Sequence, residues 1–131
     1  MYIDNLILEI KPSFGLDERK IEFVSKDNDV TINVTNSFSQ TAQTIKISKD
    51  EFQQLVATIS DIDFSKVYFE NSGKRGIDGT DTTLTISGGM SCSLAISVWS
   101  PHKSETPTET NKLVALYEKI FDLMAIEMIE F

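Results

Sequence analysis

The residue types that most often carry out chemistry are rare in this chain and meet in one short stretch. Residues 97–109, SVWSPHKSETPTE, contain the only tryptophan, Trp99, and the only histidine, His102. Acyl transfer by a serine or cysteine nucleophile requires a base such as histidine within hydrogen-bond distance. His102 follows a proline in a polar connection, beside a lysine, with no strained nucleophile turn nearby. We therefore expect His102 to be a loop residue and not a catalytic base.

The sequence also lacks the residue patterns that metal binding and phosphate binding require. Zinc sites use three or four Cys, His or carboxylate ligands, whereas this chain has one cysteine, Cys92, and one histidine. Residues 78–81, DGTD, lack the ligand spacing of a calcium-binding EF-hand. Residues 73–76, GKRG, differ from a P-loop because arginine follows the lysine and a strand follows the loop. We expect no metal, no cofactor and no enzymatic activity, with Cys92 a small buried residue.

The charge of the chain favours some classes of partner over others. Twenty Asp and Glu residues against twelve Lys and Arg give a formal net charge of −8. Phosphate backbones are bound by clustered basic residues, whereas those here are scattered, so we expect no nucleic-acid binding. Excess acid speeds the encounter with a basic partner, although it also serves solubility. Without a ~20-residue apolar run or a secretion signal, we expect a cytoplasmic protein with no membrane partner.

The elements that must position these residues begin with alternating apolar and polar side chains, the period of a half-buried strand. This alternation predicts a strand over residues 5–12, a β-hairpin over residues 19–35 and a further strand over residues 43–48. The period then changes to 3.6 after a Ser-x-x-Glu capping box at residues 48–51. A helix is therefore expected over residues 49–60, with one apolar face.

The middle of the chain predicts a second hairpin. Residues 66–70, KVYFE, have the composition of a short strand, and a polar, glycine-containing loop follows them. Residues 82–99 alternate so that apolar side chains share one face and hydroxyl side chains the other. We therefore expect one α+β domain over residues 1–131, with a largely antiparallel sheet of about six strands covered on one face by two helices.

A long helix is expected at the C-terminal end. Thr106 and Glu109 match a second capping box with Pro107 at the first helical position, which predicts a helix over about residues 107–130. Past residue 121 the helix is apolar nearly all round, so its last turns are either buried or part of a dimer interface. The residues that would fill either role are Phe121, Met124, Met128 and Phe131.

Four segments follow one another in an order that is typical of a known class of protein. They are TIKISKDEFQQLVATISDI, GIDGTDTTLTIS, AISVWSPHK and NKLVALYEKIFDLM. Over about residues 42–131 their order and spacing resemble small bacterial immunity proteins, the antidotes to polymorphic toxins of contact-dependent inhibition or type VI secretion systems. The resemblance implies a protein that binds and occludes a cognate toxin without chemistry of its own.

A partner surface is expected where acidic loops and the tryptophan lie. The net charge of −8 suits a basic toxin. Several acidic residues lie in expected loops, which is where proteins commonly contact their partners. A tryptophan at the end of a strand is a typical interface anchor. Packing of Trp99 against the C-terminal helix is the alternative. Two other functions stay open: an adaptor domain that dimerises through its last helix, and a small-molecule binder. The candidate partner-binding residues are Asp61, Asp63, Glu70, Asp78, Asp81, Trp99 and His102.

Overall fold

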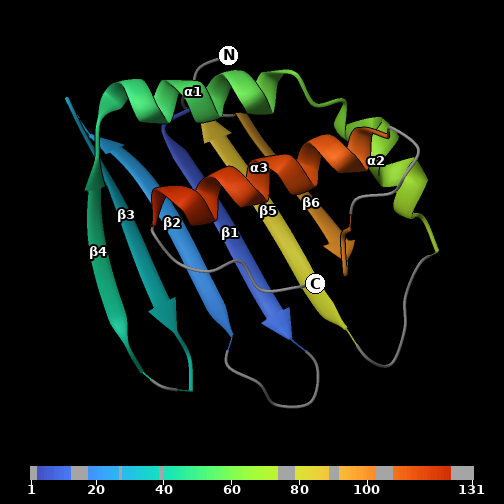
Figure 1. Cartoon of the computed structure of the whole chain (residues 1–131), viewed down its shortest axis with the longest axis horizontal. Helices are drawn as coiled ribbons and strands as arrows, with labels where there is room; N and C mark the ends of the chain where they lie inside the picture. The colour runs from blue at the N-terminus through green and yellow to red at the C-terminus, as the bar shows by residue number, and fades with distance from the viewer. Residues whose placement is uncertain are drawn as a thin grey trace.

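The computed structural model describes residues 3–12, 18–26, 28–38, 40–73, 79–88, 92–102 and 108–124. Within these ranges the chain is an α+β fold of one open sheet and helices, as predicted (Figure 1). The elements in chain order are β1 (Asn5–Pro12), β2 (Arg19–Lys26), β3 (Asp29–Asn36), β4 (Ala42–Ile47), α1 (Lys49–Ser60), α2 (Phe64–Asn71), β5 (Thr80–Gly88), β6 (Cys92–Trp99) and α3 (Glu109–Leu123).

The sheet has six strands in the order β4-β3-β2-β1-β5-β6, and each neighbouring pair is antiparallel. Strands β2 and β3 form the first expected hairpin, with Phe23 opposite Ile32. Strands β5 and β6 form the second, with Leu84 opposite Ile96. Both hairpin predictions and the predicted number of strands are confirmed. In each hairpin an apolar pair of residues faces the same side of the sheet, which sets the register.

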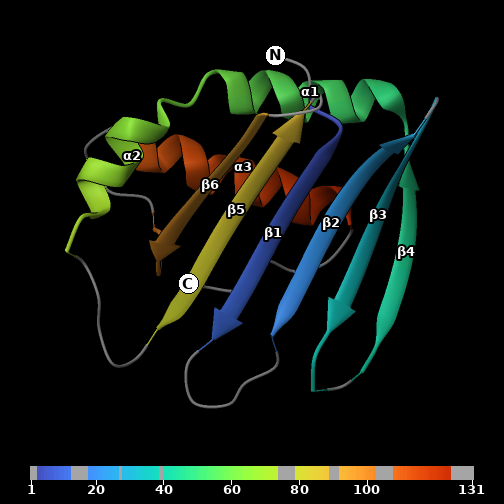
Figure 2. The ribbon, with the colours of Figure 1, turned by 180° about the vertical axis from the view of Figure 1, so that it is seen from behind.

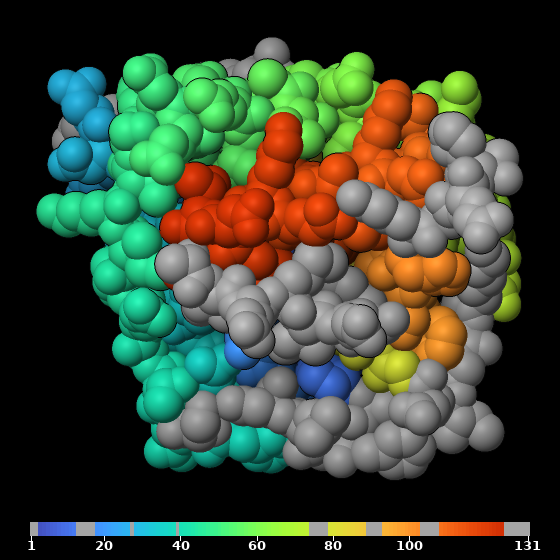
Figure 3. All heavy atoms as spheres, viewed as in Figure 1, coloured from blue at the N-terminus to red at the C-terminus, as the bar shows by residue number. Residues whose placement is uncertain are grey.

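The helices connect the two edges of the sheet. After edge strand β4 the chain passes through α1 and α2 to the far side, where β5 pairs with β1 and β6 becomes the other edge. Helix α3 then runs back beside α1, and the two form a continuous layer over one face (Figures 1 and 3). Seen from behind, the opposite face of the sheet carries none of the described helices (Figure 2). None of the helices in the described ranges has the length and apolar content to span a bilayer.

The core lies between the sheet and this helical layer. Alternate residues of each strand point into it, and the ring of Phe23 stacks on Phe52 of α1 with centroids 6.2 Å apart. One polar pair is buried there: the Thr82 hydroxyl donates to the Val98 carbonyl at 2.8 Å and lies 3.5 Å from the Tyr117 hydroxyl. Burial raises the pKa of the Tyr117 hydroxyl, so this group stays neutral.

The opposite face of the sheet is polar, as the alternation predicts. Its side chains are held by cross-strand hydrogen bonds, such as that from the Thr44 hydroxyl to Asn33 Oδ1 at 3.3 Å. On the β5–β6 hairpin the hydroxyls of Thr83 and Ser97 lie 3.0 Å apart. This half of the sheet therefore presents mainly small hydroxyl side chains.

The described residues form three helices where two were expected, and the added one corrects the prediction for residues 66–70. That segment is not a strand but part of α2, whose N-cap is Asp63. Its Val-Tyr-Phe run favours a strand by composition, but the Asp63 side chain accepts a hydrogen bond from the Lys66 backbone N–H and starts a helix.

The start of the last helix also differs from the expectation. Its N-cap is Thr108, whose hydroxyl accepts from the Asn111 N–H at 3.3 Å, so the helix begins at Glu109 and not at Pro107. Its described part ends at Leu123. Phe121 and Met124 are buried in the core of the single chain. Thr106, Pro107, Met128 and Phe131 lie outside the described residues.

Candidate functional site

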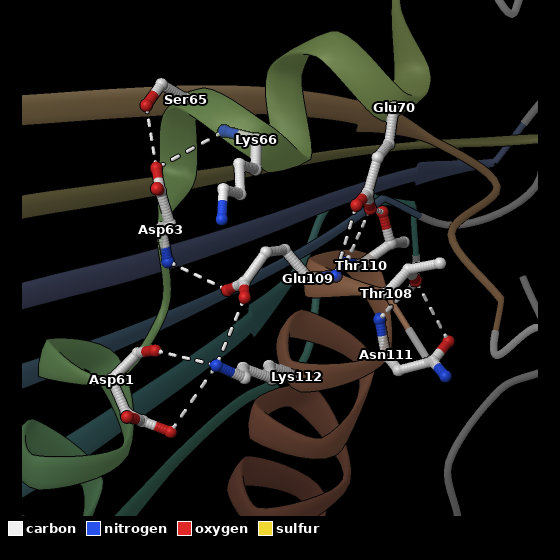
Figure 4. A network of polar contacts seen from close by, with 10 residues as sticks. All are labelled: Asp61, Asp63, Ser65, Lys66, Glu70, Thr108, Glu109, Thr110, Asn111 and Lys112. Atoms are coloured by element: carbon white, nitrogen blue, oxygen red, sulfur yellow. Dashed lines mark hydrogen bonds and ion pairs between the residues drawn. The ribbon is translucent and has the colours of Figure 1, made fainter. Parts of the chain in front are cut away.

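Five of the seven candidate partner-binding residues fall into two places in the fold. Asp61, Asp63 and Glu70 lie at the junction of α2 with α3, inside a network of polar contacts (Figure 4). Asp81 and Trp99 lie at the end of the β5–β6 hairpin and line one groove together. Asp78 lies outside the described residues.

Glu70, near the end of α2, caps the start of α3. Its carboxylate accepts from the backbone N–H of Glu109 at 3.2 Å and of Thr110 at 2.9 Å, and from the Thr110 hydroxyl at 2.6 Å. The hydrogen bond from the Thr110 hydroxyl is the main reason why the pKa of Glu70 lies below its usual range. A carboxylate at this position also interacts favourably with the positive end of the helix dipole. Glu70 therefore fixes one helix to the other.

A second set of contacts runs in the opposite direction between the same helices. The Glu109 carboxylate accepts from the Asp63 backbone N–H at 3.0 Å and pairs with Lys112 at 3.1 Å. The hydrogen bond from Asp63 is the main cause that lowers the pKa of Glu109. Lys112 also donates to the Asp61 backbone carbonyl at 3.3 Å. In Asp63 itself, the Ser65 hydroxyl is the first cause of a lowered carboxyl pKa.

The three candidate acids, Asp61, Asp63 and Glu70, therefore all make contacts within the chain. Asp61 and Asp63 are exposed, yet each also holds a neighbouring residue in place. Their carboxylates add negative charge to this end of the molecule, and a basic partner would meet that charge at long range. Hereafter we call this set the helix-junction network: Asp61, Asp63, Glu70, Glu109, Thr110 and Lys112.

The second place is a groove between α2 and the end of strand β6, with a volume of about 250 Å³. Trp99 and Asp81 are directly opposite each other in the β5–β6 register. Tyr68 of α2 supplies a second aromatic ring on the other side of the groove. We call this the edge groove, and its lining residues are Tyr68, Asn71, Ser72, Gly73, Asp81, Ser97 and Trp99.

Trp99 is held in place by the backbone beneath it. Gly79 has φ +153°, and a Cβ there would lie 2.6 Å from Trp99 Cε2, so only glycine leaves room for the indole ring. The next residue, Ser100, has φ +43° and ends the strand. Its N–H donates to the Thr80 carbonyl at 2.7 Å, and its hydroxyl accepts from the Thr80 N–H at 2.9 Å. Trp99 is half-buried and lines the edge groove together with Tyr68 of α2.

His102 is exposed in the turn after β6. Its Nδ1 lies 3.3 Å from the Ser100 carbonyl oxygen, two residues earlier. The described residues include no group of three or more His, Cys, Asp and Glu side chains that could hold a metal ion. The geometry around His102 is thus that of a local turn.

Strand β6 is an exposed edge of the sheet. Because the Ser100 N–H bonds to the Thr80 carbonyl, antiparallel alternation turns the backbone N–H and C=O groups of Ser93, Ala95 and Ser97 away from β5. No strand pairs with that side in the part of the chain that the structure describes. Edge strands are usually guarded by charges or proline, and β4 at the other edge has Lys46. Strand β6, CSLAISVW, has neither.

Exposed apolar side chains flank this edge. Leu94 of β6 is 43% exposed, and on α2 Tyr68 and Phe69 are 61% and 74% exposed. The two aromatic rings contact each other edge to face, with centroids 5.7 Å apart. Sequence reasoning named neither of them, because residues 66–70 were assigned to a strand. An Asp N-cap followed by Phe64 and Val67 at helical spacing is the signal that points to this helix.

Comparison of the chain with protein-family models, with curated proteins and with solved structures finds no match.

Proposed function

We propose that this protein is an immunity protein, which binds a cognate basic toxin domain and blocks it without chemistry of its own. The observation that carries the proposal is strand β6, an uncharged edge of eight residues beside the exposed Tyr68 and Phe69. Such an edge is a template for a further strand, and natural proteins guard it unless a partner uses it. The net charge of −8 favours a basic partner.

In this proposal, the partner adds an extended segment to β6 and is held there by main-chain hydrogen bonds. Aromatic residues supply large contact areas at low entropic cost, which suits Tyr68, Phe69 and Trp99 as anchors. Blocking works by occlusion: when the toxin domain is bound along β6, this protein covers the part of the toxin surface that it contacts. The protein would act in the cytoplasm, where an imported toxin does its damage.

Of the two other functions, the dimerising adaptor has less support from the packing. It relies on the apolar end of α3, but Phe121 and Met124 are buried against the sheet and α1 within one chain. For the small-molecule binder, the edge groove of about 250 Å³ is below the ~300–1,000 Å³ typical of pockets for drug-sized ligands. Two surface hollows of about 380 and 390 Å³ are larger, but they are lined mainly by polar and charged side chains, whereas ligand pockets are mostly apolar.

The test is co-expression with the proposed toxin partner, which is sought as a toxin domain encoded next to the gene of this chain. The wild-type chain should restore growth, and Ala95→Lys should abolish this protection because a charge is placed on the exposed edge. Gln43→Lys on β4 is the matched control, since it adds the same charge to the other edge strand and should still protect. Equal killing with and without the wild-type chain would refute the immunity function. Full protection by Ala95→Lys would instead refute the role of β6.

A further inference from the structure

The edge groove has the chemistry of a site for one cationic side chain. Among the lining residues that the structure describes, Asp81 is the only carboxylate, and none carries a positive charge. Asp81 is exposed, and no described residue forms a hydrogen bond or ion pair with its side chain. It differs in this from the acids of the helix-junction network, whose carboxylates are taken by neighbours within the chain.

The other lining groups also favour a donor. The amide nitrogen of Asn71 already donates to the Val67 carbonyl at 2.8 Å and to the Thr110 hydroxyl at 2.9 Å. The polar atom of this side chain that can still bind a ligand is therefore its carbonyl oxygen, which is an acceptor. Trp99 and Tyr68 bring two aromatic rings to the same groove. The face of an aromatic ring attracts a cation within about 6 Å of its centroid.

We propose that the edge groove binds an arginine side chain of the protein partner. A guanidinium is flat enough to stack on Trp99 while its N–H groups pair with the Asp81 carboxylate, which the rounder ammonium of lysine cannot do at once. The volume of about 250 Å³ suits a single long side chain. This inference rests on the proposed function and names the residue type by which a basic partner is recognised.

The only tryptophan of the chain lies in this groove, so its fluorescence reports binding directly. The probe is N-acetyl-arginine amide, and its neutral isostere N-acetyl-citrulline amide is the control ligand. We expect a saturable change of Trp99 emission with the arginine probe at millimolar concentration, and at least tenfold weaker binding of the citrulline probe. A linear, unsaturated change, or equal binding of both probes, overturns the proposal.

Two pairs of variants locate the site. Asp81→Asn should weaken the arginine probe at least fivefold, whereas Asp122→Asn, an exposed acid on α3, should leave it unchanged. Tyr68→Leu should weaken it, whereas Phe69→Leu should not, because Phe69 is adjacent in α2 but does not line the groove. Asp81→Asn that binds like wild type refutes the proposal.

The probe titration and the co-expression test have independent outcomes, so failure of one proposal can be told from failure of the other. If the wild-type chain protects cells but the arginine probe does not saturate, the immunity function stands and the groove has another role. If the probe binds as expected but the wild-type chain gives no protection, the groove assignment stands and the immunity function falls.

Discussion

Trp99 owes its position to Gly79, and we expect a methyl group at residue 79 to displace the ring. Gly79→Ala combines an unfavourable φ with a Cβ inside the volume of the indole, so it should lower the free energy of unfolding by about 1–3 kcal/mol. The emission maximum of Trp99 should shift to longer wavelength as the ring becomes exposed. Urea unfolding followed by fluorescence measures both quantities.

Gly73→Ala is the matched control for this substitution. Gly73 also has a positive φ, +77°, but a Cβ there meets no atom within 4 Å. The control variant therefore carries the backbone strain without the collision and should keep the wild-type emission maximum. Identical emission and stability of the two variants would contradict the supporting role of Gly79.

The junction of α2 and α3 depends on carboxylates whose pKa values are lowered in the folded protein. Hydrogen bonds to Glu70, Asp63 and Glu109 favour their charged forms. Their contribution to stability is therefore complete above the unfolded carboxyl pKa of about 4.3 and is lost as the pH falls through the lower folded values. We expect the urea midpoint to drop as the pH falls below about 5.

Glu70→Gln tests how much of this loss belongs to the capping of α3. The variant should be less stable than wild type by about 1 kcal/mol at neutral pH, since an amide is a weaker acceptor at a helix start. The difference should shrink as the pH falls through the lowered pKa of Glu70, where the wild-type carboxylate is itself protonated. Glu18→Gln, an exposed acid before β2, should track the wild type at every pH. A difference that stays constant with pH would rule out the charge of Glu70 as its cause.

The elements show why some of this fold could be predicted and some could not. Strand alternation and the Ser48 capping box are local patterns, and they placed β1, the hairpins and the 49–60 helix correctly. Helix α2 has a single buried residue, Val67, so it shows almost no apolar stripe. Tertiary contacts with residues distant in the sequence stabilise it, such as the hydrogen bonds that join Asn71 and Glu70 to Thr110 of α3.

The capping of α3 illustrates the same limit for the site. Glu70 caps a helix that begins 39 residues later, and no local spacing reveals such a pair. Asp81 and Trp99, by contrast, are opposite residues of a hairpin, so the alternation that predicted the hairpin also brings them together. Sequence reasoning named both residues, but the facing ring of Tyr68 depends on α2 and was missed.

At the scale of the whole molecule, the negative charge lies outside the strand that forms the proposed binding edge. Strand β6 has no charged residue, although the chain has a net charge of −8. Long-range attraction of a basic partner and short-range contact along the edge are thus supplied by different residues. Long-range attraction governs mainly the association rate, and short-range contact governs the dissociation rate.

This separation gives a prediction for binding to the proposed toxin partner. Raising the salt from about 50 mM to about 500 mM should slow association on the order of tenfold and leave dissociation nearly unchanged, because salt screens exposed charges beyond a few ångströms. Surface plasmon resonance measures both rates. Ala95→Lys and Gln43→Lys change the net charge equally, so their association rates should respond to salt alike. Only Ala95→Lys should speed dissociation, and equal dissociation rates of the two variants would place the short-range contact elsewhere than β6.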